Sequence, residues 1–183
     1  MTRSMRTGIA GAGLVLGLAT ALARTPPGAE SGAGDARAAL ARVAFDRFRA
    51  LEGSWEGRST KGWTEDVSFR TIAGGSAVVE TSFDAHPGET MLTVVHMDGA
   101  DLTLTHYCVA KNQPRMRATA FGDGGRTVTF EFAGGGNLAD RNRGHMDGAV
   151  FRFEDADHVV ARWSWYENGS ERWMEEIRMV RKR

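Results

Sequence analysis

The feature that most constrains this chain is a two-residue alternation of apolar and polar side chains from Gly53 almost to the C-terminus. Alternation with this period is typical of β-strands, because successive side chains point to opposite faces of a sheet. Turn signals built on glycine interrupt it at short, even intervals, and the chain has 23 Gly but only 4 Pro. The predicted strands are 54–61, 64–73, 76–84, 90–97, 101–109, 115–121, 126–133, 148–154, 158–167 and 170–180.

About ten short strands joined by tight hairpins predict an antiparallel meander, and therefore a closed barrel or a sandwich. Short connections and the absence of a long Greek-key crossover favour an up-and-down β-barrel. The segment 134–147 is too polar for a core strand. We expect it to form a long loop.

One helix is expected before the strands. Apolar residues at positions 40, 43, 44, 48 and 51 have helical spacing between Ala36 and Leu51. Asp35 is suited to cap the start of this helix, and Gly53 follows its end. The predicted fold class is therefore all-β, an antiparallel barrel with one N-terminal helix.

The first residues have the pattern of a secretory signal peptide. Arg3 and Arg6 precede an apolar run of 15 residues, Gly8 to Leu22, which ends in the small-x-small sequence Ala21-Leu22-Ala23. A membrane-spanning helix needs about 20 apolar residues, so cleavage after Ala23 is favoured over an uncleaved anchor. We expect residues 1–23 to be a signal peptide, 24–35 a flexible leader and 36–183 the barrel domain. The mature protein is then expected in the periplasm or outside the cell, with no integral membrane span.

Composition excludes several classes of protein. The chain has 23 Lys and Arg against 23 Asp and Glu, so its net charge is zero. A sequence-independent nucleic-acid binder needs a basic excess to displace counterions, and we expect no nucleic-acid partner. The single Cys excludes an intrachain disulfide framework. No phosphate-binding loop, dinucleotide fingerprint or nucleophile-elbow motif is present.

Two motifs resemble a known group of barrels. The first is Gly53-Ser54-Trp55-Glu56-Gly57, and the second is Thr105-His106-Tyr107-Cys108 followed by Asn112-Gln113-Pro114-Arg115-Met116. Together they resemble an uncharacterised bacterial family of lipocalin-like (calycin or nitrobindin-type) barrels. The resemblance implies that Trp55 covers the closed end of the barrel under a basic side chain from the last strand. The candidates for that side chain are Arg172, Arg178 and Arg181.

Neither haem nor a metal ion is expected. Nitrobindin-type barrels bind haem through a histidine of a late strand, but the residues around His158 do not match that pattern. The five histidines are also not predicted to lie around one metal ion. Pairing across the hairpin at Asp98-Gly99 places His96 and His106 on opposite faces of the sheet, whereas a metal needs its ligands around one point.

The same pairing predicts which face lines the barrel. One face is more apolar and is assigned inward; it carries Met91, Thr93, Val95, Leu102, Leu104, His106 and Cys108. His106 is then either a polar anchor in an apolar pocket or a buried histidine satisfied by a neighbouring group. Cys108 is either a pocket residue or a small core filler. The two side chains lie about 7 Å apart along one strand, too far for direct proton transfer.

Arg115 and Arg117 share a face of one predicted strand. Two interpretations stay open for them: an anion-binding pocket, or an outer surface with Met116, Ala118 and Ala120 facing inward. Arg115 adjoins a loop at the barrel rim. It is therefore a candidate for binding an acidic head group, with a solvated rim residue as the alternative.

The leading functional hypothesis is binding or transport of a small, largely apolar ligand inside the barrel. The candidate ligand-binding residues are His106, Cys108, Leu104, Arg115 and Met91, and the structural signature is Gly53, Trp55 and Gly57. One alternative is an enzyme, an isomerase or hydrolase that uses His106 in the cavity. Another is an assembly barrel whose interior is filled.

Overall fold

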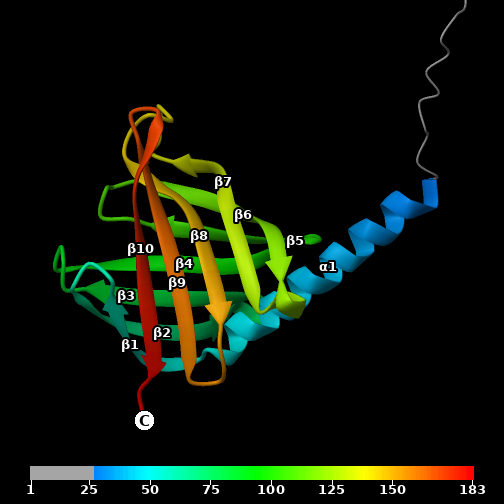
Figure 1. Cartoon of the computed structure of the whole chain (residues 1–183), viewed down its shortest axis with the longest axis horizontal. Helices are drawn as coiled ribbons and strands as arrows, with labels where there is room; N and C mark the ends of the chain where they lie inside the picture. The colour runs from blue at the N-terminus through cyan, green and yellow to red at the C-terminus, as the bar shows by residue number, and fades with distance from the viewer. Residues whose placement is uncertain (1–26) are drawn as a thin grey trace, which may run out of the picture.

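The strands close into one antiparallel barrel in which each strand pairs with its neighbours in sequence and β1 pairs with β10 (Figure 1). The structure is a computed structural model, and it describes residues 27–183. Within them are α1 (Pro27–Ala50) and ten strands: β1 (Gly53–Ser59), β2 (Thr64–Ile72), β3 (Ala77–Asp84), β4 (Glu89–Asp98), β5 (Asp101–Tyr107), β6 (Gln113–Gly122), β7 (Thr127–Gly136), β8 (His145–Phe153), β9 (His158–Glu167) and β10 (Ser170–Arg181). The predicted up-and-down barrel with an N-terminal helix is confirmed.

The β7–β8 connection is shorter than the sequence predicts. β7 continues to Gly136 and β8 begins at His145, so residues 137–144 form the loop. The extension of β7 consists of three glycines, two of which pair with Gln113 and Pro114 of β6. Glycine carries no side chain and leaves no alternation to detect, which is why this part of the strand was predicted as loop.

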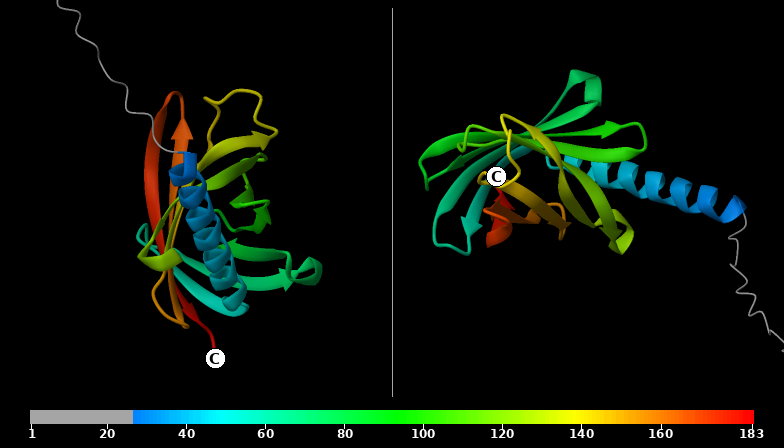
Figure 2. Two further views of the ribbon diagram at one scale, coloured as in Figure 1. Left: turned by 90° about the vertical axis from the view of Figure 1, so that its right-hand side faces the viewer. Right: turned by 90° about the horizontal axis from the view of Figure 1, so that it is seen from above.

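The helix begins earlier than predicted, at Pro27 instead of Ala36. Residues 27–35, expected to form a flexible leader, are therefore helical, and they project away from the barrel (Figure 2, right). Once the packed half of a helix exists, extending it is far less costly than nucleating a new one, and proline is tolerated in a first turn. The predicted signal peptide, residues 1–23, lies outside the described residues.

The C-terminal half of α1 closes one end of the barrel. Ala41, Ala44 and Phe48 are fully buried there. The Phe48 ring lies 5.0 Å from the ring centroids of both Phe151 and Phe153, edge to face. The helix thus contributes its apolar stripe to the barrel core.

Trp55 seals this closed end as the family resemblance implies. Its indole is fully buried and donates a 2.8 Å hydrogen bond to the carbonyl of Leu51. Of the three candidate arginines, Arg181 is the one that stacks on it, with its guanidinium 4.3 Å from the ring centroid. Gly53 has a φ of 131°, which lets the chain leave the helix and enter β1 directly.

The other residue of the signature, Gly57, lies where a side chain of β10 packs closely against β1. A Cβ at this position would lie 2.9 Å from Cγ2 of Ile177. Glycine is therefore required for this close approach between strands β1 and β10.

Replacing Arg181 with alanine is expected to lower the free energy of unfolding by about 2–3 kcal/mol, because charge-assisted hydrogen bonds are lost together with the stack on Trp55. Arg181 donates to the carbonyls of Glu52 (2.7 Å) and Ala50 (3.0 Å) at the end of α1. Urea unfolding followed by tryptophan fluorescence measures the change. Arg178→Ala, an exposed position on the same strand, is the control, and equal losses in the two variants would contradict this role.

Candidate ligand-binding site

The end of the barrel opposite α1 is hollow. A cavity of about 440 Å³ opens there between the β1–β2, β3–β4 and β5–β6 connections. This volume is within the range of small-molecule pockets. Its lining consists of Lys61, Trp63, Asp84, His86, Pro87, Met91, Cys108, Val109, Met146, Trp165 and Glu175. We call this space the mouth.

A smaller chamber of about 30 Å³ lies deeper in the barrel. Its lining consists of Glu65, Glu80, Ser82, Asp84, Met91, Thr93, His106, Met146, Trp163, Glu175 and Ile177. Four of these residues, Asp84, Met91, Met146 and Glu175, also line the mouth. We call the chamber the floor, because shared walls make it the inner end of the same cavity.

The walls of the mouth are mostly apolar and aromatic, with Lys61, Asp84, His86 and Glu175 among them. Trp63 stacks on His86, with ring centroids 4.9 Å apart and planes inclined by 17°. Met91 and Met146 contribute flexible thioether side chains from β4 and β8, which adapt readily to the shape of a ligand. Trp165 of β9 also lines the mouth.

The floor holds an unusual group of buried carboxylates: Glu65, Glu80, Asp84 and Glu175. Their exposed fractions are between 4% and 6%. Glu65 and Asp84 are directly opposite one another on β2 and β3. Ser59 donates a hydrogen bond to Glu175, and the backbone N–H of His86 donates one to Asp84 at 2.7 Å. Hydrogen bonds of this kind reduce the free-energy cost of burying a carboxylate.

The surroundings of these carboxylates raise their pKa values. Burial, and then the neighbouring charges of Glu80, Asp84 and Glu175, raise the pKa of Glu65 to about 8. Burial raises the pKa of Glu80 to about 7, although a hydrogen bond with Thr93 opposes this shift. Burial likewise raises the pKa values of Asp84 and Glu175. Carboxyl groups of the floor therefore keep their protons at pH values near neutral, at which exposed carboxyl groups are ionised.

His106 lies on the floor as part of a polar ladder across three strands. Glu80 of β3 is opposite Thr93 of β4, which in turn is opposite His106 of β5. The Thr93 hydroxyl lies 3.1 Å from His106 Nδ1. The other ring nitrogen, Nε2, is buried and has no hydrogen-bond partner among residues 27–183. Burial lowers the pKa of His106 to about 4, so the imidazole is neutral at physiological pH.

The structure brings together some of the predicted site residues. His106 and Met91 line the floor, and Met91 and Cys108 line the mouth. Burial raises the pKa of the Cys108 thiol, which favours its uncharged form. Leu104 faces inward as predicted, but it is fully buried in the packed core and borders neither space.

Arg115 does not face the cavity. It is exposed on the outer side of β6, next to Gly134 of β7, and borders neither the mouth nor the floor. Arg117, on the same side, lies 3.6 Å from Asp101 in an ion pair. Met116 and Ala118 occupy the inner side of β6 and are fully buried. The second of the two interpretations is thus found for Met116 and Ala118, which fill the core. Ala120, also expected to face inward, is exposed, because a register shift between Ala118 and Ala120 changes the alternation.

The carboxylates of the floor were missed by reasoning from the sequence, although a signal for them exists. Glu80, Ser82 and Asp84 alternate in phase with Val78, and Glu65 alternates in phase with Val67 and Phe69. The buried residues Val78, Val67 and Phe69 mark this face as the inner one. Polar residues that share the inward-facing side of a strand with buried apolar residues indicate a cavity with polar groups in its wall.

The carboxylates and histidines of the described chain do not form a metal centre. Within residues 27–183, no three His, Cys, Asp or Glu side chains are placed so that they could hold a metal ion. The acidic floor is therefore distinguished by buried carboxyl groups with raised pKa values and not by metal-ligand geometry.

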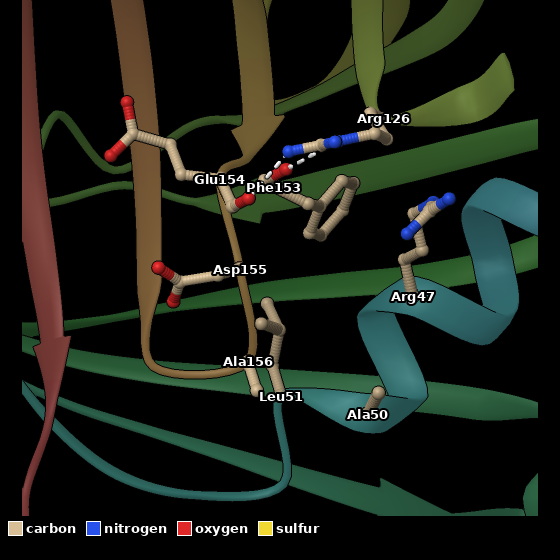
Figure 3. Close-up of a pocket in the computed structure, with 8 residues that line it drawn as sticks. All are labelled: Arg47, Ala50, Leu51, Arg126, Phe153, Glu154, Asp155 and Ala156. Atoms are coloured by element: carbon tan, nitrogen blue, oxygen red, sulfur yellow. Dashed lines mark hydrogen bonds between the residues drawn. The ribbon is translucent and has the colours of Figure 1, made fainter. Parts of the chain in front are cut away.

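A pocket of about 380 Å³ at the closed end is a second concave region. It lies between the end of α1 and the β8–β9 connection, with Arg47 and Arg126 among its lining residues (Figure 3). Arg126 donates hydrogen bonds to the carbonyls of Phe153, at 3.3 Å, and Glu154. Its guanidinium thus already ties the turn before β7 to the end of β8.

Comparisons with known proteins do not assign a function. No protein-family model matches the chain, and no curated protein matches it. Among solved structures, it is similar to a protein of unknown function from the DUF3598 family of Nostoc punctiforme, with 9% identity and a TM-score of 0.48. The match covers 74% of this chain and 49% of the other, so the chain spans about half the length of that protein. No helix within residues 27–183 has the length and apolar character needed to cross a membrane.

Proposed function

We propose that this barrel binds a small, largely apolar molecule in the cavity formed by the mouth and the floor. The observation that carries the proposal is a hollow of about 440 Å³ with apolar walls that ends on buried polar groups. Binding sites for small molecules usually combine an apolar lining with a few polar groups that orient the ligand. An assembly barrel with a filled interior would have no reason to retain four buried carboxyl groups, because burying polar groups without full hydrogen bonding is destabilising.

An enzyme centred on His106 is less well supported than a binding site. A general acid or base is most effective when its pKa is near the working pH. Burial holds the pKa of His106 at about 4, whereas that of Glu80 is about 7. His106 is therefore suited to donate or accept a hydrogen bond in its neutral form, and not to exchange protons at neutral pH.

Binding of a neutral fluorescent probe, N-phenyl-1-naphthylamine, tests the proposal. We expect saturable binding to the wild-type protein, and at least a tenfold weaker affinity for Met91→Trp, which fills the junction of mouth and floor. The matched control is Leu92→Trp, since Leu92 is the next residue of β4 and points outward. Probe fluorescence measures both affinities. Non-saturable binding, or equal weakening by the two substitutions, would contradict a pocket inside the barrel.

We also propose that the protein is exported. The proposal is supported by the signal-peptide pattern of residues 1–23: two arginines, an apolar run and a small-x-small cleavage site.

A further inference from the structure

We propose that the ligand carries a protonated amine and places it on the floor, between the carboxylates of Glu65 and Glu80 and the free Nε2 of His106. The inference rests on the proposed function, since it names the chemistry of the molecule that the pocket takes. Two independent observations point to it: the group of buried carboxylates, and a buried imidazole nitrogen on the same chamber that has no partner among the described residues.

The floor is rich in hydrogen-bond acceptors. The side chains of Glu65, Glu80, Asp84 and Glu175 accept hydrogen bonds when ionised, and those of Ser82 and Thr93 accept and donate. At the mouth, Lys61 lowers the pKa of Glu175 and His86 lowers that of Asp84, but burial outweighs both effects. No positive side chain among residues 27–183 offsets the shift at Glu65 or Glu80. The missing element is a donor with positive charge, and an ammonium group supplies three N–H donors together with that charge.

When Glu80 is ionised, the hydrogen bonds from Glu80 through Thr93 to His106 make the imidazole a further acceptor for the ligand. The Thr93 hydroxyl then donates to the Glu80 carboxylate and accepts a hydrogen bond from Nδ1–H of His106. This tautomer leaves a lone pair on Nε2, which borders the floor. A bound ammonium ion thus finds carboxylate and imidazole acceptors in one place, and binding displaces the protons that the carboxylates hold in the empty pocket.

The dimensions match a primary amine with an apolar body. A floor of about 30 Å³ has room for a group the size of water or ammonium, whereas the mouth, at about 440 Å³, has room for a ring and a short chain. The aromatic and thioether walls of the mouth suit the apolar part. A divalent cation is the other ligand that buried carboxylates attract, but the described residues do not offer metal-binding geometry.

Displacement of N-phenyl-1-naphthylamine by three compounds of one shape tests the inference. The compounds are 4-phenylbutylamine, 4-phenylbutanol and 4-phenylbutyrate, which share the ring and chain and differ in charge. At pH 8.5 we expect the amine to displace the probe at a concentration at least tenfold lower than the alcohol, and the carboxylate to be the weakest of the three. Between pH 8.5 and pH 6 the amine should lose at least tenfold in affinity, because Glu65 and Glu80 bind protons again, while the alcohol should change little.

The variants Glu65→Gln and Glu80→Gln should each reduce the preference for amine over alcohol and leave the affinity for the alcohol close to wild type. Asp66→Asn is the charge-matched control: it removes a carboxylate from the outer face of β2, one residue away from Glu65, and should keep the preference. Equal displacement by amine and alcohol overturns the ammonium site and leaves the pocket standing. Displacement by none of the three also overturns it. Failure of the probe itself to bind overturns the proposed function instead.

Discussion

Glu80→Gln is expected to stabilise the protein at pH 8.5 by about 3 kcal/mol, a shift of about 6–12 °C in Tm, and to have little effect near pH 5. Burial raises the pKa of Glu80 from 4.5 in the unfolded chain to about 7 in the folded protein. The folded state therefore binds this proton more tightly, and its contribution to stability is fully present below pH 4.5 and is lost as the pH rises through 7. Glutamine removes the charge that must otherwise be buried at high pH.

Glu65 adds to this pH dependence and His106 opposes it at lower pH. The raised pKa of Glu65, about 8, makes stability fall further between pH 7 and pH 8. The lowered pKa of His106, about 4, makes stability fall as the pH drops from 6.5 toward 4, because the unfolded chain then binds a proton that the folded one does not. Between pH 4.5 and pH 6.5 His106 therefore partly offsets the loss of stability caused by the carboxylates, whereas the loss between pH 6.5 and pH 8 comes from the carboxylates alone.

Thermal unfolding of the wild-type protein, Glu80→Gln and Asp66→Asn at pH 5, 6.5 and 8.5 measures these effects. Asp66 is exposed, so its substitution should leave the pH dependence unchanged. If Glu80→Gln were no more stable than the wild type at pH 8.5, the carboxylate would not be buried as the structure places it.

Phe48→Ala is expected to lower the free energy of unfolding by about 3–5 kcal/mol, the usual cost of removing a large aromatic side chain from a core. Phe48 is fully buried and contacts the rings of Phe151 and Phe153 edge to face, and that of Phe130 at 6.2 Å. It is the main aromatic contact between α1 and the barrel wall, so its loss both leaves a cavity and loosens the helix.

Urea unfolding followed by far-ultraviolet circular dichroism measures the loss for Phe48→Ala. Val43→Ala on the same helix is the control; Val43 is 42% exposed, and we expect its substitution to cost less than 1 kcal/mol. Probe binding at the opposite end of the barrel should persist in Phe48→Ala at temperatures where the protein is folded. An equal loss of stability in the two variants would show that α1 does not contribute Phe48 to the core.

The barrel was predictable because alternation and turns are local properties. The strands around His106 show this best: the hairpin at Asp98-Gly99 determined that His106 and Met91 share a face, and the apolar character of that face placed it inward. The structure pairs Met97 with Leu102 and buries His106. The stack of Arg181 on Trp55 followed from the family resemblance, which did not distinguish it from Arg172 and Arg178.

The acidic floor was not predictable in the same way because it is formed by strands distant in sequence. Glu65, Glu80 and Glu175 come from β2, β3 and β10, and they meet only when the sheet closes. Charged residues in a strand usually mark its solvated face, so no single strand singled out these carboxylates as candidates for the site. The early start of α1 was missed for a different reason: residues 27–35 project from the barrel, and no apolar stripe marks them as helix.

A crystal structure of the protein grown with saturating 4-phenylbutylamine at pH 8.5 tests the central claim most directly. The predicted result places the phenyl ring among Trp63, Met91 and Met146, with the nitrogen within hydrogen-bond distance of Glu65 or Glu80 and of His106 Nε2. Side chains of the mouth packed together over an empty floor, with the compound bound outside the barrel, would contradict it.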